Sequence, residues 1–322
     1  MFVFYHSFIF LLLIVVGFII LTKDSVNLYQ YPSKILLFGE YSVIAGSEAL
    51  ALPVFNYGAS WQKSLVNNTG KDQLKQFAQY LNDPENGFDS FIDIEKLNTQ
   101  LQEGLYLKSD IPQGYGLGSS GSVCAAVLHR FAKIHPADIS TKELQYLFAK
   151  MESYFHGTSS GIDPLVAYLQ KPILVNADKS LSFPNLPPHT KHSLPEIFLY
   201  DSGIARKTEA LVKLFREKLE NTAFHTAVYS QLVPIVSELI HNWANGNENV
   251  FEHIKKISAW QLENMPEFIP NQVLGVWQKY AQSQSIQFKL CGAGGGGFFL
   301  VFKQRHLNLP ESLKDKLIAL DV

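Results

Sequence analysis

Hydrophobic residues follow two different patterns along the chain. In the segment 2–21 almost every residue is apolar, and the first charged residue is Lys23. From Tyr31 onward the apolar residues fall in short runs broken by glycine, a pattern typical of β-strands separated by turns. The runs that predict strands are 35–38, 49–54, 172–175, 196–200, 286–290 and 298–302.

Two helices are predicted in the middle of the chain. The first begins at Ser119 or Ser120, directly after a glycine-rich loop, and ends by Pro136. The second has Thr141 as its N-cap and stops at Gly157. Its apolar residues recur at helical spacing, at positions 144, 147, 148, 151 and 155.

The remaining segments predict a division into two domains. Residues 60–104 are polar and varied, and predict connecting strands, loops and a short helix around 93–103. A long helix from Lys207 onward and two or three further helical stretches through about residue 280 are also predicted. The proline-rich segment 183–195 separates these halves, so the predicted domains are 23–190 and 191–322.

Composition narrows the class of protein. Hydrophobic residues make up 47% of the chain and charged residues 17%, which excludes a mainly disordered protein. The net charge of −2 lacks the basic excess of a protein that binds nucleic acid. The two cysteines, Cys124 and Cys291, predict neither a disulfide framework nor a cysteine zinc site and favour a reducing compartment.

The apolar segment 2–21 has three interpretations. As a helix, it would span roughly 30 Å of hydrocarbon and anchor a cytoplasmic body to a membrane. A cleaved signal peptide is disfavoured, because no basic region precedes the segment and no small-residue cleavage site follows it. Alternatively, residues 1–22 arise from start assignment, and the natural protein is cytoplasmic and begins near Lys23.

Two glycine-rich segments are candidates for ligand contact. The segment 114–121, GYGLGSSG, leads into a predicted helix, whose free N–H groups and positive dipole end would cradle a phosphate. It follows neither the GxxxxGK[ST] nor the GxGxxG spacing, and a flexible turn is the alternative. The segment 292–297, GAGGGG, joins two predicted strands, either as a bulged hairpin or because a ligand comes close.

Three charged residues carry candidate chemistry. Glu152 projects from the same side of its helix as His156 and lies at the edge of the apolar stripe. There, Mg²⁺ with phosphate oxygens would satisfy a buried carboxylate, unless Glu152 is simply solvated at the rim. Asp163 precedes Pro164, where turn chemistry is the alternative. Lys34 adjoins an apolar run and needs a carboxylate or phosphate partner, or else reaches solvent.

Four segments resemble the motifs of one enzyme family. In chain order, YPSKILLFGEYSVIAG, IPQGYGLGSSGSV, ESYFHGTSSGID and KLCGAGGGGF are similar to signature motifs of the GHMP small-molecule kinases. The resemblance extends from about Tyr31 to Phe302. It implies a two-domain α+β fold with an N-terminal domain like domain 2 of ribosomal protein S5 and a ferredoxin-like C-terminal domain. The active site would lie in the cleft between them.

The resemblance also implies roles for individual residues, with ATP and Mg²⁺ as cofactors. Asp163 matches the catalytic aspartate that takes the proton from the attacking hydroxyl, and Lys34 matches the lysine that pairs with it. Glu152 and Ser120 match the Mg²⁺ ligands. The ATP-binding positions are Gly114, Tyr115, Gly116, Leu117, Gly118, Ser119, Ser120 and Gly121. The acceptor-binding positions are Lys34, Glu40, Tyr41, His156, Asp163, Gly294 and Gly295.

Within this superfamily the chain is most similar to the mevalonate kinases, through HGTSSGID, KLCGAGGGG and DSGIARKTEALV. The implied reaction is ATP-dependent phosphorylation of the primary hydroxyl of mevalonate to 5-phosphomevalonate, in isoprenoid biosynthesis. Tyr41, where that family usually has His, and the segments GEYSV and YGLGSSGSV are closer to phosphomevalonate kinase, the alternative. Arg206 and Lys207 are the cations that a phosphorylated acceptor could use.

Two other classes of protein remain as alternatives. A diphosphomevalonate decarboxylase-like lyase is similar to these kinases but lacks the first-motif lysine, so Lys34 argues against it. Retention of Lys34, Glu152 and Asp163 argues against a non-catalytic ligand sensor. The expected partner is a small-molecule substrate, with no nucleic acid, and with a membrane only if residues 1–22 are genuine. Homodimers are common in the family that the chain resembles.

Overall fold

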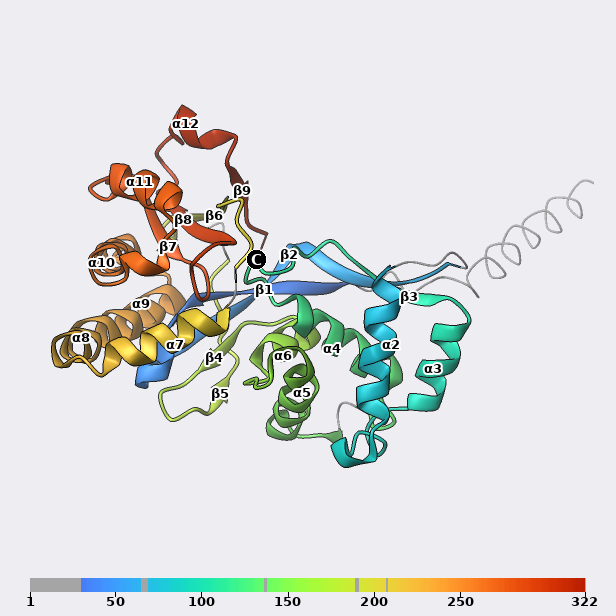
Figure 1. Cartoon of the computed structure of the whole chain (residues 1–322). Coiled ribbons are helices and arrows are strands. Elements are labelled where there is room, and N and C mark those ends of the chain that lie inside the picture. The colour runs from blue at the N-terminus through green and yellow to red at the C-terminus, as the bar shows by residue number, and fades with distance from the viewer. Residues whose placement is uncertain (1–29, 65–68, 136–137, 189–190, 207, 322) are drawn as a thin grey trace, which may run out of the picture.

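Two antiparallel β-sheets, each packed against helices, make up the described part of the protein (Figure 1). The computed structural model describes residues 30–64, 69–135, 138–188, 191–206 and 208–321. The apolar segment 2–21 and Lys207 therefore lie outside the described residues. Within the described ranges, no helix has both the length and the apolar character that crossing a membrane requires.

The first sheet is built around the long strand β2 (Ala49–Lys63). One edge of β2 pairs with β1 (Tyr31–Phe38). The other edge pairs at its start with β4 (Ile173–Val175) and at its end with β3 (Leu105–Ser109). The short strand β5 (Leu181–Ser182) extends the sheet beyond β4. The strands predicted at 35–38, 49–54 and 172–175 are thus confirmed, although β2 continues further than predicted.

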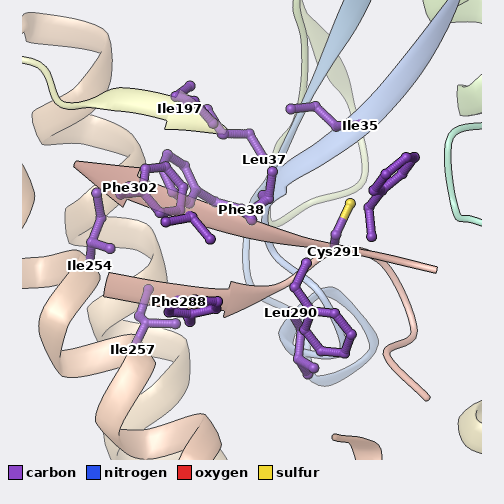
Figure 2. Packing of buried hydrophobic residues seen from close by; sticks show 14 of the residues in the cluster. Ile35, Leu37, Phe38, Ile197, Ile254, Ile257, Phe288, Leu290, Cys291 and Phe302 are labelled. Carbon is purple, nitrogen blue, oxygen red and sulfur yellow. The ribbon is translucent and has the colours of Figure 1, made fainter. Parts of the chain in front are cut away.

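Both faces of the first sheet are buried, which explains its nearly unbroken apolar runs. Successive side chains on a strand point to opposite faces. Ile35 and Leu37 belong to a core shared with the second sheet, whereas Ala51 and Trp61 belong to a core under the helices. Figure 2 shows Ile35 and Leu37 in the same cluster of buried side chains as Ile197 and Phe302 of the second sheet. Because both faces are buried, these strands have nearly continuous apolar runs instead of the alternating apolar and polar residues of a half-exposed strand.

Five helices accompany the first sheet within the described residues. Two of them, α4 and α6, lie directly on β1 and β2, and α2 lies on β3 (Figure 1). The five are α2 (Thr69–Asn82), α3 (Ile94–Gln102), α4 (Ser119–Phe131), α5 (Thr141–His156) and α6 (Ile162–Leu169).

For residues 69–82 the sequence predicts strands and loops, and this prediction is wrong because the segment forms helix α2. The buried residues Leu74, Phe77 and Leu81 of α2 recur at a helical spacing within an otherwise polar segment. The predicted short helix around 93–103 is confirmed as α3. The helical spacing of apolar residues that indicates α2 is therefore present in the sequence, but the many polar residues around it make it hard to recognise.

Two helix ends differ from the prediction. The N-cap of α5 is Ser140 rather than Thr141, because Ser140 and Glu143 form a capping box in which each side chain accepts from the other residue's backbone N–H. Helix α4 ends at Phe131, earlier than Pro136, because Ala132 already has extended backbone geometry. The predicted stop of α5 at Gly157 is confirmed.

The second sheet has the strand order β7-β8-β6-β9. Along the chain, a strand, several helices, two strands, a short helix and a last strand follow one another, which is the βαββαβ arrangement of a ferredoxin-like fold. The strands predicted at 196–200, 286–290 and 298–302 are confirmed. The four strands are β6 (Glu196–Asp201), β7 (Ile286–Leu290), β8 (Phe298–Lys303) and β9 (Leu317–Ala319).

The helices of the second half agree with the predicted long helix and further stretches. Helix α8 continues through a π-helical turn, Val228–Leu232, into α9. Helices α10 and α11 pack against β7. The helices are α7 (Thr208–Leu219), α8 (Thr222–Ala227), α9 (Val233–Asn245), α10 (Val250–Asn264), α11 (Asn271–Tyr280) and α12 (Glu311–Lys314). The division into domains 23–190 and 191–322 stays a prediction.

Candidate active site

A lysine and an aspartate from distant parts of the chain form an ion pair at the centre of the candidate site. Lys34 lies on β1, and Asp163 lies in the first turn of α6. The Nζ of Lys34 is 2.8 Å from Oδ1 of Asp163. The side chain of Lys34 is 11% exposed and that of Asp163 is 32% exposed. A substrate can therefore reach the carboxylate while the lysine stays enclosed.

Burial and pairing act on Lys34 in opposite directions. Burial lowers the pKa of its ammonium group, whereas the charge and hydrogen bond of Asp163 raise it, and the net pKa is raised. Lys34 is therefore held as a cation at neutral pH. Of the two alternatives that the sequence left open, Lys34 has a carboxylate partner rather than reaching solvent.

The glycine-rich segment 114–121, hereafter the phosphate loop, packs directly on this ion pair. The N–H of Lys34 donates to the carbonyl of Leu117 at 2.9 Å. Gly118, with φ of +68°, caps the N-terminus of α4. A Cβ at Gly118 would lie 2.9 Å from Cγ of Lys34 and 3.3 Å from Oδ2 of Asp163, so a side chain there would displace the loop. The N-terminus of α4, the end of a helix that favours anions, is thus held beside the ion pair.

Glu152 is the third ionisable group of this cluster. Helix α5 carries it, and the residue is only 4% exposed. Its Oε1 accepts from Oγ of Ser120 at 2.9 Å, and its Oε2 accepts from Oγ of Ser159 at 2.5 Å. Nε2 of His156 lies 2.9 Å from the same Ser120 oxygen. Burial, assisted by the charge of Asp163, raises the pKa of Glu152 to about 7.

A cavity of about 800 Å³ opens beside the cluster, between α2, β3, α4 and α5. Gly114, Ser119, Ser120 and His156 line the part next to the phosphate loop. Its volume lies within the range of about 300–1,000 Å³ that small-molecule sites occupy. Aromatic and amide side chains line other parts of the cavity, among them Gln73, Gln76, Phe77, Tyr106, Gln113, Tyr154 and Phe155.

Glu40 pairs with a different residue of the interior, Lys289 on β7. The side chains are 3% and 1% exposed, respectively. Burial raises the pKa of Glu40, and the charge of Lys289 opposes that rise. The carboxylate therefore serves an internal ion pair, and its contact with an acceptor stays a prediction.

Tyr41 is also turned into the interior. Its hydroxyl donates to the carbonyl of Ala293 at 2.6 Å, and its ring packs against Phe215 and Phe268. The residue is 5% exposed. The hydroxyl of Tyr41, which was predicted to bind the phosphoryl acceptor, is thus hydrogen-bonded within the protein.

Arg206 connects the phosphate loop to residues 291–297, hereafter the second glycine-rich loop. Its Nη1 donates to the carbonyls of Cys291 at 2.7 Å and Gly294 at 3.3 Å. Its backbone N–H donates to the carbonyl of Gly114 at 3.2 Å. A Cβ at Gly116 would collide with the guanidinium group. Burial lowers the pKa of Arg206. Arg206 is therefore hydrogen-bonded to both glycine-rich segments.

The predicted acceptor residues Gly294 and Gly295 both pack on protein. A Cβ at Gly294 would lie 2.5 Å from the carbonyl oxygen of Phe268. A Cβ at Gly295 would lie 2.6 Å from Cδ1 of Leu211. These close contacts account for glycine at both positions without a ligand.

Sequence reasoning missed Lys289 and Ser159. Lys289 interrupts the apolar run 286–290, and a lysine in a buried strand needs a carboxylate partner, which is the argument already applied to Lys34. That signal was available. Ser159 gives no comparable signal, because its hydrogen bond to Glu152 depends on how the chain turns after α5.

A comparison with known protein families matches the part of the chain that carries most of these site residues. Residues 74–171 match the family model described as the GHMP kinases N terminal domain. This range includes the phosphate loop, Glu152 and Asp163. This segment therefore resembles a GHMP kinase N-terminal domain. Two of the four motifs predicted from the sequence, 111–123 and 152–163, lie within this range and are thus supported by an independent comparison.

Related proteins extend the GHMP kinase similarity over most of the chain. The mevalonate kinase of Pyrococcus abyssi is 26% identical over 302 residues, which cover 83% of this chain and 85% of that protein. L. major mevalonate kinase, solved with R-mevalonate, has a TM-score of 0.55 at 15% identity and 90% coverage of both chains. Streptococcus pneumoniae phosphomevalonate kinase, solved with phosphomevalonate and AMPPNP, has a TM-score of 0.55 at 16% identity, covering 84% of this chain and 90% of that one. These two structures show a shared GHMP kinase fold.

Proposed function

We propose that the protein is an ATP-dependent kinase that phosphorylates the primary hydroxyl of mevalonate to give 5-phosphomevalonate. The observation that carries the proposal is the Lys34–Asp163 ion pair at 2.8 Å, packed against the phosphate loop with its carboxylate open to solvent. Similarity to mevalonate kinases over 83% of the chain supports the choice of acceptor.

Asp163 is the proton acceptor in this proposal. Its exposed carboxylate takes the proton of the acceptor hydroxyl as the hydroxyl oxygen attacks the γ-phosphorus of ATP. Lys34 holds the carboxylate in place, and its positive charge stabilises the oxygen as the proton leaves. General-base catalysis of this kind contributes about 10²–10⁴-fold to the rate.

The phosphate loop positions the triphosphate. The N–H groups at the start of α4 point toward the anion, and Ser119 and Ser120 link the loop to the cavity in which the nucleoside lies. Phosphoryl transfer depends mainly on alignment and on neutralising charge. The loop backbone and Lys34 supply both without a covalent intermediate.

The residues of the site fit a Mg²⁺ ion. Glu152 and Ser120 offer carboxylate and hydroxyl oxygens, the ligand types that Mg²⁺ prefers. Burial raises the pKa of Glu152 to about 7 despite its hydrogen bonds to Ser120 and Ser159, so a bound cation would stabilise the ionised carboxylate. Bound by these two side chains and by phosphate oxygens, the ion would neutralise charge on the triphosphate.

The contacts of Arg206 favour an unphosphorylated acceptor. A second phosphate on the acceptor requires additional cations, for which the sequence offers Arg206 and Lys207. The Nη1 of Arg206 is already bound to the carbonyls of Cys291 and Gly294. Lys207 lies outside the described residues. Phosphomevalonate is therefore the less favoured acceptor.

An acceptor assay on the full-length protein tests this proposal. ADP release is measured with ATP and Mg²⁺ in the presence of either mevalonate or phosphomevalonate, with product mass as a second readout and Asp163→Asn as control. We expect mevalonate-dependent ADP release and a product heavier by one phosphoryl group. Turnover of phosphomevalonate alone would reassign the acceptor, CO₂ release would indicate a lyase, and binding without ADP release would indicate a sensor.

A further inference from the structure

We propose that Tyr41 is a positioning residue for phosphoryl transfer, which fixes the second glycine-rich loop instead of binding the acceptor. The catalytic consequence rests on the proposed kinase function. The structural part rests on the contacts of Tyr41 with this loop. The two parts can therefore be tested separately.

The second glycine-rich loop needs external contacts to hold one conformation. Gly292 and Gly294 through Gly297 all have positive φ angles. Glycine loses more backbone freedom on ordering than any other residue, so a run of this kind is costly to fix. Its geometry is therefore determined by the side chains that hold it from outside.

Tyr41 contacts this loop in two ways. Its hydroxyl donates to the carbonyl of Ala293 at 2.6 Å, across 252 positions of sequence. Its ring lies edge-on to Phe268, with ring centroids 5.0 Å apart, and the carbonyl of Phe268 accepts from the N–H of Gly295 at 2.6 Å. The ring of Phe215 also packs on Tyr41, with ring centroids 4.6 Å apart. Loss of the hydroxyl would remove the direct contact and leave the aromatic packing.

The backbone of Tyr41 is held in an unusual conformation. Its φ is 62° and its ψ is −43°, a region that bulky residues rarely adopt. Strained residues persist where surrounding contacts hold them, and they cluster at functional sites. Here the strain directs the ring inward between α7 and the turn that carries Phe268.

The loop is linked in turn to the reacting groups. The carbonyls of Cys291 and Gly294 hold the guanidinium of Arg206, whose backbone N–H is bonded to Gly114 of the phosphate loop. At the other end of the phosphate loop, Gly118 packs on Lys34 and Asp163. Loosening the second loop would therefore misplace the phosphate loop, although no side chain that touches substrate is removed.

Two conservative variants test the inference in the full-length protein. Tyr41→Phe removes only the hydroxyl that reaches Ala293. Tyr80→Phe is the matched control, because the Tyr80 hydroxyl also donates to a backbone carbonyl, that of Lys150, at 3.0 Å, and this bond joins α2 to α5. Hydrogen exchange of the peptide 291–298 and steady-state kinetics are measured for both variants.

For Tyr41→Phe we expect amide exchange in 291–298 to rise about 3- to 10-fold, which is the loss of one hydrogen bond. We expect kcat to fall by a similar factor, with the KM for the acceptor changed by less than about twofold, since no acceptor contact is lost. The control should change neither quantity. Unchanged exchange in 291–298, an equal rise in the control, or a loss confined to acceptor KM would each overturn the inference. Absence of turnover in the unmodified protein would refute the kinase proposal, and the exchange result would still decide the positioning role.

Discussion

Two lysine–carboxylate pairs in this protein are built from similar sequence patterns and differ in access. Lys34 adjoins the apolar run of β1, and Lys289 interrupts that of β7, and each pairs with a carboxylate from another segment of the chain. The carboxylate of Asp163 is 32% exposed beside the phosphate loop, whereas that of Glu40 is 3% exposed. Solvent access to the carboxylate, and not the presence of a lysine partner, therefore distinguishes a candidate reaction centre from an ion pair that only stabilises the fold.

The largest expected effect concerns the accessible pair. Asp163→Asn keeps the shape of the side chain and removes the proton acceptor, so we expect kcat to fall by about 10²–10⁴-fold. Lys34→Met should cause a comparable loss. Steady-state ADP release measures the effect, and calorimetry with a non-hydrolysable ATP analogue serves as the control, since nucleotide binding should be largely retained. Near-normal turnover in either variant would remove the basis of the proposed chemistry.

The second-largest effect is expected for the buried pair of Lys289 and Glu40. Lys289→Met leaves the buried Glu40 without its cation, so the free energy of unfolding should fall by about 3–5 kcal/mol. The double variant Lys289→Met/Glu40→Gln should recover much of the loss, because no unpaired charge remains. Urea denaturation measures both. If the single variant were as stable as the unmodified protein, the pair would not brace the fold.

The third effect concerns the buried Glu152, whose carboxylate oxygens accept from the neutral hydroxyls of Ser120 and Ser159. Its folded-state pKa of about 7 exceeds the ordinary value of 4.5, so between these pH values the folded state binds more protons than the unfolded state. The free energy of unfolding of the metal- and nucleotide-free protein should therefore fall as pH rises from about 4.5 to about 7, on the order of 3 kcal/mol in total.

Glu152→Gln should remove this pH dependence, because the amide does not titrate. The exposed residue Glu95 provides the matched control, and Glu95→Gln should leave the dependence in place. Denaturation midpoints at a series of pH values measure the difference. An identical slope in Glu152→Gln and the unmodified protein would contradict the assignment.

The smallest effect is expected for a third ion pair, which is open to solvent on both sides. Lys63 and Glu103 lie 3.3 Å apart with side chains 56% and 55% exposed. Solvent screens such pairs, so Lys63→Gln should change the free energy of unfolding by less than about 0.5 kcal/mol. A loss as large as that of Lys289→Met would show that exposure does not rank these pairs.

The sequence predicts the candidate site better than it predicts its surroundings. The pairing of Lys34 with Asp163, 129 positions apart, and the clustering of Glu152 with Ser120 were implied by the resemblance of their segments to GHMP kinase motifs. The bond between Tyr41 and Ala293 joins positions 252 apart, and no local pattern identifies such a partner. Long-range contacts of this kind depend on how the two sheets pack.

The same distinction applies to the fold. Strands with two buried faces were found because their apolar runs are continuous, as in 49–54. Helix α2 was missed, because its apolar positions Leu74, Phe77 and Leu81 are separated by polar residues and packed against β3 and α5. Its stability comes from tertiary packing, which local propensity does not report.

The doubly buried first sheet also has a consequence for synthesis on the ribosome. All five strands of that sheet have been made by residue 182, yet one face, with Ile35 and Leu37, is covered by a core that includes Phe302. The last of those covering residues, on β8, are made about 120 residues after residue 182, which at about 5–20 residues per second is roughly 6–24 s of translation. During that interval the apolar sheet face of the nascent chain is only partly covered, which makes the chain a candidate client for chaperones and sensitive to pauses in elongation.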